Sequence, residues 1–188
     1  MTRVEQRVAM VRAAVAAGDD EAAAVVLDLM ERDAMLSPEL ALELVPSVWD
    51  RCGAPMLVLS VASWVGLFRR AGYTHDFEPA PQPTEPVRLY RGSDPAGELG
   101  MCWSTNPDVA RWLASRFPDG RVWSAVVEPE RLLAFVAPLY EDQYVVDTTW
   151  LRPVLFEGPD VVAALDLDGL FERLDLMVED AAARGCLP

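Results

Sequence analysis

The stretch Val87-Arg88-Leu89-Tyr90-Arg91-Gly92 decides how the second half of the chain is interpreted. It follows Pro86, it is short and largely apolar as far as Tyr90, and Arg91 closes it. A short apolar run between a proline and a glycine predicts a β-strand. We therefore expect a strand at 87–90 with an arginine at its end.

Two segments further along the chain also place polar side chains beside predicted elements. Trp103-Ser104-Thr105 is an aromatic residue followed by a hydroxyl pair, and Asn106-Pro107-Asp108 then predicts the cap of a helix. Glu141-Asp142-Gln143 is an acidic turn in front of a strand expected at 144–146. An arginine, a serine and a carboxylate thus follow one another, each next to an expected strand or helix.

The rest of the second half predicts short strands and helices joined by turns. Strands are expected at 122–127, 133–136 and 151–156, and helical segments at 160–183 with a break at Asp168-Gly169. The helix after Asn106 is expected to turn four apolar residues inward: Val109, Ala110, Leu113 and Phe117. This order predicts an α+β domain. The strand spacing is not that of βαβ units, and the sequence has no glycine-rich phosphate loop.

The first half predicts a helical domain at 1–72. Four short helices are expected at 4–17, at 22–35, from Pro38 onward and at 55–70, with Pro46 kinking or ending the third. Helices joined this tightly suggest an antiparallel bundle. Residues 73–86 contain Pro79, Pro81, Pro83 and Pro86 and predict an extended linker. A second domain is expected at 87–188.

Composition narrows the classes of function. The chain has 188 residues, 52% of them hydrophobic, and a formal net charge of -14 with a pI near 4.4. Such an acidic balance keeps a protein soluble and repels nucleic-acid backbones, so nucleic acid is an unlikely partner on charge grounds. Solubility is the simpler explanation of the acidity; an acidic face that binds a basic protein is the alternative.

Cysteine and histidine usage predicts neither a metal site nor a histidine-based triad. Cys52, Cys102 and Cys186 are scattered, which is typical of reduced thiols, and His75 is the only histidine. Cys102 is read as a small apolar filler, because no base lies near it in sequence to activate it. The N-terminus has no signal peptide and the apolar run 54–68 is too short for a membrane span. We expect a cytoplasmic protein that binds neither membrane nor metal.

The three polar segments, in their order and spacing, resemble the arginine, serine and glutamate motifs of mono-ADP-ribosyltransferases from bacteria and phages. The resemblance covers roughly residues 87–147. Members of this family split NAD and pass its ADP-ribose to a target. The resemblance therefore implies a split β-sheet core behind an N-terminal helical bundle, with NAD as substrate, no metal, and a toxin or phage-effector role.

The resemblance also implies roles for the first two motifs. Arg91, flanked by Tyr90 and Gly92, would bind NAD, and its planar guanidinium suits a diphosphate. Ser104 would contact the nicotinamide ribose. Thr105 would support the strand, and Trp103 would border the nicotinamide. On the residues alone, Arg91 also fits a strand-end salt bridge, residues 104–106 also fit a helix cap, and Trp103 also fits a core residue.

The third motif would supply the carboxylate for an oxocarbenium-like transition state and contact the target. Tyr140 would touch the acceptor, and Glu141 hints at an arginine acceptor on a protein. The family's glutamate reads as Gln143 here. This glutamine is an introduced change, the mark of a natural weak or inactive relative, or a sign that Glu141 does the chemistry. Glu141-Asp142 also fits a plain solvated turn.

Two further functions fit the same residues. A non-catalytic interaction protein would keep the fold and bind a partner through its acidic surface and helices. An NAD glycohydrolase would share the site and use water as the acceptor.

Overall fold

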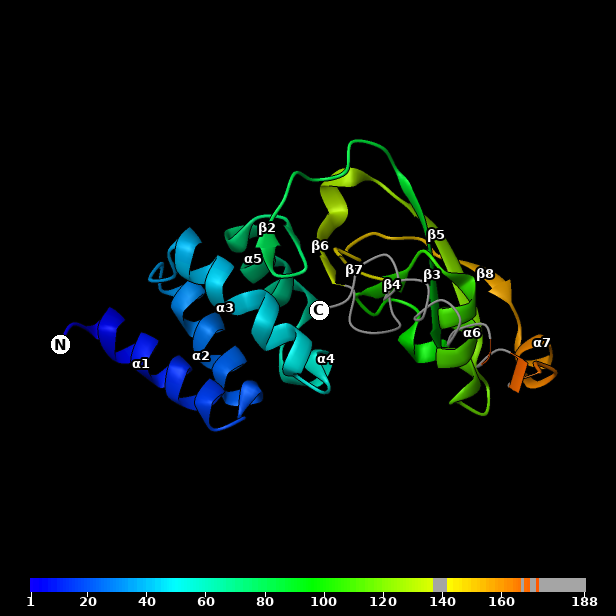
Figure 1. The fold of residues 1–188 in the computed structure, drawn as a ribbon, viewed down its shortest axis with the longest axis horizontal. Coiled ribbons are helices and arrows are strands. Elements are labelled where there is room, and N and C mark those ends of the chain that lie inside the picture. The colour runs from blue at the N-terminus through cyan, green and yellow to red at the C-terminus, as the bar shows by residue number, and fades with distance from the viewer. Residues whose placement is uncertain (137–141, 167, 170–171, 173–188) are drawn as a thin grey trace. The chain divides into compact units, whose positions relative to one another are not determined.

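The computed structural model describes residues 1–136, 142–166, 168–169 and 172, and the chain forms two compact units. The first unit is Met1–Gln82 and the second is Pro83–Pro188. The division falls inside the proline-containing segment 73–86. Figure 1 labels the helices and strands of both units.

The first unit is built from helices. They are α1 (Arg3–Ala16), α2 (Asp20–Arg32), α3 (Pro38–Arg51), the short α4 (Pro55–Val58) and α5 (Val61–Ala71). Local capping explains where they begin: Thr2 and Glu5 form a capping box, and the side chains of Asp19 and Ser37 accept backbone N–H groups of the next turn. The first three predicted helices are present, with boundaries shifted by a few residues.

An aromatic cluster holds the first unit together. The ring centroid of Trp49 lies 4.9 Å from that of Trp64 and 5.5 Å from that of Phe68, both in edge-to-face contact. Trp64 is fully buried, and its indole N–H donates to the Pro55 carbonyl at 2.9 Å. The cluster therefore joins α3 to α5 and ties the short α4 to both.

Three expectations for the first unit were wrong. Pro46 does not end α3, which continues to Arg51 with the buried proline inside it. The expected helix at 55–70 is broken because Leu59 is extended and the Ser60 side chain caps α5. Residues 73–86 are not wholly extended, because β1 (Thr74–His75) and β2 (Glu78–Pro79) form a small hairpin.

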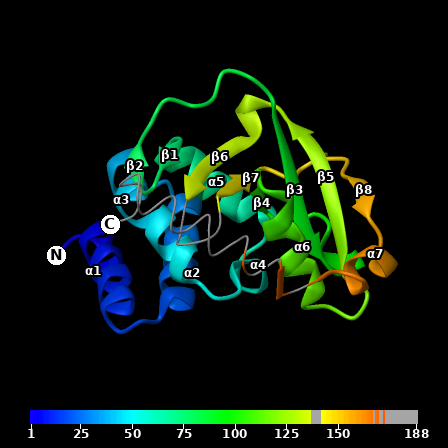
Figure 2. The same cartoon turned by 45° about the vertical axis from the view of Figure 1, so that its right-hand side comes forward.

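The second unit contains a six-stranded run of antiparallel neighbours. The strands are β3 (Val87–Ser93), β4 (Cys102–Ser104), β5 (Arg121–Val127), β6 (Leu132–Val136), β7 (Gln143–Val146) and β8 (Val154–Glu157). Their order is β6-β7-β4-β3-β5-β8. Helix α6 (Pro107–Ser115) packs against β3 and β5, and α7 (Pro159–Ala163) follows β8 (Figures 1 and 2). The predicted mixed α+β class is confirmed.

Small residues let α6 approach the sheet closely. A Cβ on Gly92 would lie 1.8 Å from the carbonyl oxygen of Ala110, so only glycine fits at this point of β3. Ala110, Ala114 and Val122 form a buried cluster at the contact, with Tyr90 packed against it. Ala110 is buried in this cluster, and Val109 is buried in a second one with Trp112 and Leu113 packed against it; both were expected to be buried.

Several boundaries of the second unit differ from expectation. Phe117 was expected to face inward from the helix, but α6 ends at Ser115 and Phe117 is 42% exposed in the following turn. Strand β4 was not predicted as a strand, because it has only three residues. Of the helical segments expected at 160–183, α7 is described and most of the remainder lies outside the described residues. Within the described part, no helix combines the length and apolar character that crossing a bilayer requires.

Candidate functional site

Three residues from distant parts of the chain form one row across the sheet. Ser104 in β4 pairs with Tyr90 in β3 on one side and with Gln143 in β7 on the other. Neighbouring strands lie about 4.8 Å apart, and directly paired residues point to the same face. The structure thus brings together one residue from each of the three motifs, and we name Tyr90, Ser104 and Gln143 the cross-strand row.

Ser104 also shapes the start of α6. It is 3% exposed, and its Oγ accepts the backbone N–H of Asn106 at 3.0 Å. Asn106 in turn accepts the Asp108 N–H at 2.9 Å and caps the helix. Thr105, between them, is exposed. The Ser104 hydroxyl hydrogen is still a donor, and the residue directly across from it in β7 is Gln143.

Arg91 points to the opposite face of the sheet from the cross-strand row. Successive strand residues alternate in direction, and its neighbours Tyr90 and Gly92 both face α6. The Arg91 Nε donates to the Gly97 carbonyl and Nη1 donates to the Cys102 carbonyl, each at 2.7 Å. Arg91 therefore holds the loop between β3 and β4.

The charge of Arg91 survives its burial. Desolvation lowers the pKa of this guanidinium, but the ordinary value is so high that it stays protonated near neutral pH. Its Nη2 makes no hydrogen bond to any described residue. A Cβ at Gly100 would lie 2.0 Å from that Nη2, so the loop passes close to the cation.

Trp103 and Cys102 are structural residues of strand β4. Trp103 is 1% exposed, and its indole N–H donates to the Gly100 carbonyl at 2.7 Å. It pairs with Tyr144 and shares the face opposite Ser104, so it does not border the cross-strand row. The half-buried Cys102 lies on the same face of β4 as Ser104.

The acidic motif is described only in part. Gln143 begins β7 and is half-buried, and Asp142 before it is exposed. Tyr140 and Glu141, the residues predicted to contact the acceptor, lie outside the described residues. Of this motif, only Gln143 is therefore placed in the site.

An ion-pair network beside the site was not foreseen. Arg111 in α6 donates to both carboxylate oxygens of Glu157 in β8, with contacts of 2.5 to 3.1 Å, and to Asp108 at 2.7 Å. Hydrogen bonding to Glu157 raises the pKa of Arg111 above its ordinary value. Nothing in the sequence indicated the Arg111–Glu157 ion pair, because the two residues are far apart in the chain.

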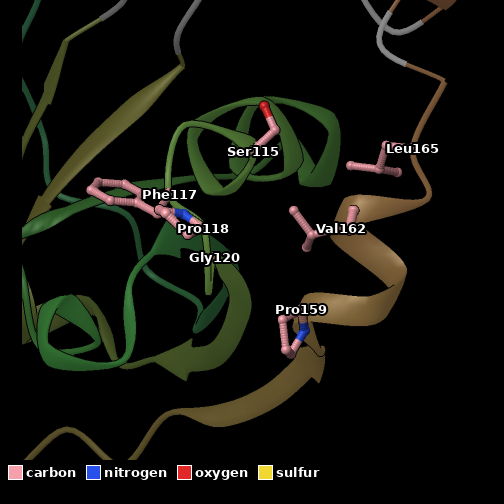
Figure 3. Close-up of a pocket in the computed structure, with 8 residues that line it drawn as sticks. Ser115, Phe117, Pro118, Gly120, Pro159, Val162 and Leu165 are labelled. Carbon is pink, nitrogen blue, oxygen red and sulfur yellow. The ribbon is translucent and has the colours of Figure 1, made fainter.

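A separate pocket of about 260 Å³ lies at the C-terminal end of α6. Figure 3 shows it between the turn that follows α6 and the helix α7. Its lining residues are Ser115, Phe117, Pro118, Gly120, Pro159, Val162, Ala163 and Leu165. None of them belongs to the three motifs. Across the described residues, no cluster of three or more histidine, cysteine, aspartate or glutamate side chains could hold a metal ion.

Comparison with known proteins gives no match. No protein-family model matches the chain. No curated protein matches it. No solved structure matches it.

Proposed function

We propose that the chain is an NAD-dependent mono-ADP-ribosyltransferase of the arginine, serine and glutamate type. The second unit would carry the reaction on a split sheet, and the helical first unit would select a protein acceptor in the cytoplasm. Gln143 would leave the present sequence weakly active or inactive. The resemblance of residues 87–147 to the family motifs is the starting point of this proposal.

The observation that carries the proposal is the cross-strand row. Ser104 and Gln143 are directly paired although 39 positions separate them (143 minus 104), and Tyr90, the neighbour of Arg91, pairs with Ser104 from the other side. A reaction through an oxocarbenium-like state needs a carboxylate held by a fixed hydrogen-bond donor. A glutamate at position 143 would have the Ser104 hydroxyl beside it for that purpose.

Arg91 would act from the neighbouring position of the same strand. Two of its nitrogens hold backbone carbonyls, which fixes the guanidinium, and Nη2 makes no bond within the described part of the chain. A diphosphate that reaches this edge could accept from Nη2. Because Arg91 lies on the other face from Ser104, NAD would have to pass over the end of the strands.

The first experiment restores the carboxylate. Gln143→Glu is expected to raise NAD consumption by on the order of a hundredfold, because the charge stabilises the developing cation. NAD turnover and transfer of label from tagged NAD in host lysate measure this directly. Gln6→Glu, which adds the same charge on exposed α1, should leave both readouts unchanged.

The outcomes separate the alternatives that the sequence leaves open. Activity already present with Gln143 would point to Glu141 as the working carboxylate. NAD loss without labelled protein would indicate a glycohydrolase. If Gln143→Glu is silent and calorimetry detects no NAD binding, the enzyme proposal is wrong.

A second candidate is a non-catalytic interaction protein on the same fold. The specific observation in its favour is that all three motif residues already have structural uses or lack charge. Arg91 holds two backbone carbonyls, Ser104 supports the α6 cap, and Gln143 is neutral. This candidate predicts no NAD binding in either form of position 143.

A further inference from the structure

Strand β8 ends the row of strands in the second unit. It pairs with β5 on one side, and among the described residues no strand pairs with its other side (Figure 2). The outward backbone N–H and C=O groups of such an edge strand can pair with a further strand. β8 therefore presents the backbone groups that strand addition uses.

The sequence of β8 is that of an interior strand. Val154, Leu155 and Phe156 follow one another in the chain and are 61%, 52% and 44% exposed. A continuous apolar run is typical of a strand that is covered on both faces, whereas exposed edge strands usually carry charged residues or proline that discourage pairing. Three consecutive exposed apolar residues on an edge therefore indicate a surface that a partner covers.

The apolar side chains of β8 lie on both faces of the sheet. Phe156 contacts Tyr90, which packs beneath α6, with 5.0 Å between the ring centroids, so Phe156 lies on the α6 face. Leu155 pairs with Trp123, which lies on the opposite face. A partner that packs on one face would leave the other face exposed. A strand added to the edge places its own side chains beside those of β8 on both faces.

The edge is held in place before a partner arrives. The ring of Phe156 is fixed by its edge-to-face contact with Tyr90, and Glu157 at the end of the strand accepts hydrogen bonds from Arg111. An edge that is already ordered loses little conformational entropy when another strand pairs with it.

The two ends of β8 carry opposite charges. Arg152 precedes the strand and Asp160 follows it; both are exposed, and neither forms an ion pair with any residue in the described ranges. When two identical strands pair antiparallel, the Arg152 end of each copy lies beside the Asp160 end of the other. The edge is therefore complementary to itself in charge as well as in apolar character. A twofold contact of this kind closes after two copies.

We propose that β8 is a docking edge for a second copy of the chain, which pairs antiparallel with it through its own β8. The apolar side chains of the two strands pack beside one another, and Arg152 of each copy lies next to Asp160 of the other. A four-residue strand buries a small area, so the expected dimer dissociates on dilution. The interface lies outside the three motifs and does not depend on the reaction proposed above.

Sedimentation equilibrium of the whole chain over a wide range of protein concentration measures the dimer. An ionic strength of about 0.15 M screens the repulsion between two chains of net charge -14 beyond about 8 Å. Leu155→Lys puts a like charge on both copies within the pairing. Leu57→Lys makes the same change at a residue of α4 that is 89% exposed, and it is the matched control.

The natural sequence and Leu57→Lys are expected to dimerise with the same dissociation constant. Leu155→Lys should raise that constant about tenfold or more. Its Tm, measured at a dilution where the natural sequence is monomeric, should stay close to that of the natural sequence because Leu155 is already half exposed; this separates lost pairing from lost folding. A natural sequence that is monomeric at every concentration, or a dimer that Leu155→Lys does not weaken, would overturn the proposal.

Charge reversal tests whether the partner is a second copy in the antiparallel orientation. Arg152→Glu should weaken the dimer, because a like charge then lies next to Asp160 of the other copy. Adding Asp160→Arg should restore the dimer; the first change removes two units of charge and the second adds two, so the net charge returns to -14. Arg12→Glu, the same change at an exposed arginine of α1, is the control and should leave the dimer unchanged. A double variant that dimerises no more tightly than Arg152→Glu alone contradicts this pairing.

Discussion

Gly92 marks the closest approach of β3 to α6. The position does not need a positive φ; it needs the absence of a Cβ, because that atom would lie 1.8 Å from the Ala110 carbonyl and 2.5 Å from the Ala114 nitrogen. Both neighbours are helix backbone and cannot rotate away. The same glycine follows Arg91, so a shift of the helix here would also disturb the strand that carries the guanidinium.

Gly92→Ala is therefore expected to destabilise the fold by about 1–3 kcal/mol, the usual cost of overpacking a tight core. Urea unfolding measures the change in the free energy of unfolding. Gly158→Ala is the control in the same unit, because a Cβ there meets no atom within 4 Å. If Gly92→Ala lowers the free energy of unfolding no more than Gly158→Ala does, α6 can move away from β3 to make room for the added methyl group, and the prediction is wrong.

At the scale of elements, α6 packs on β3 and β5 and is also linked to β4 and β8, the strands on either side of that pair. Its cap begins at the end of β4 through Ser104 and Asn106, and its middle is joined to β8 through Arg111 and Glu157. The Glu157 side chain is 14% exposed and that of Arg111 is 24% exposed, so this pair is largely shielded from water. The helix thus positions the strand ends that form the cross-strand row.

Arg111→Met is expected to cost about 1–3 kcal/mol of stability, because it removes charge-assisted hydrogen bonds and leaves Glu157 buried without its partner. Glu157→Gln should cost less, and the double variant should cost less than the sum of the two single changes. A double-mutant cycle in urea measures this coupling. Strictly additive effects would mean that Arg111 acts through Asp108 alone.

Local signals predicted the elements better than the site. The helix starts at Ser37-Pro38 and Asn106-Pro107 could be predicted, because a few adjacent residues determine a helix cap. The three-residue β4 and its pairing with Tyr90 and Gln143 depend on partners far along the chain, which periodicity does not encode. For the same reason the opposite orientation of Arg91 could not be predicted from composition.

At the scale of the whole molecule, the charge is strongly one-sided. Thirty acidic residues stand against sixteen basic ones, and several arginines are already held in ion pairs such as Arg12–Glu43 and Arg70–Glu31. The remaining carboxylates repel one another across the surface, and such self-repulsion opposes compact states. Exposed ion pairs contribute little in return.

Raising the salt concentration is therefore expected to stabilise the protein. The Debye length falls from about 30 Å at 0.01 M to about 8 Å at 0.15 M ionic strength, which screens repulsion between distant carboxylates while leaving close, shielded pairs such as Arg111–Glu157 mostly intact. Thermal unfolding in sodium chloride should show a Tm that rises over this range and then levels off.

Neutralising exposed glutamates tests whether net charge is the cause of this salt dependence. Glu85, Glu128 and Glu130 are exposed and form no ion pair with any residue that the structure describes. Changing all three to glutamine should raise the Tm at low salt and flatten its rise with salt, because fewer like charges remain to be screened. A Tm that falls as salt is added would mean that attractive ion pairs outweigh repulsion in this chain, and the triple variant would then leave the slope unchanged.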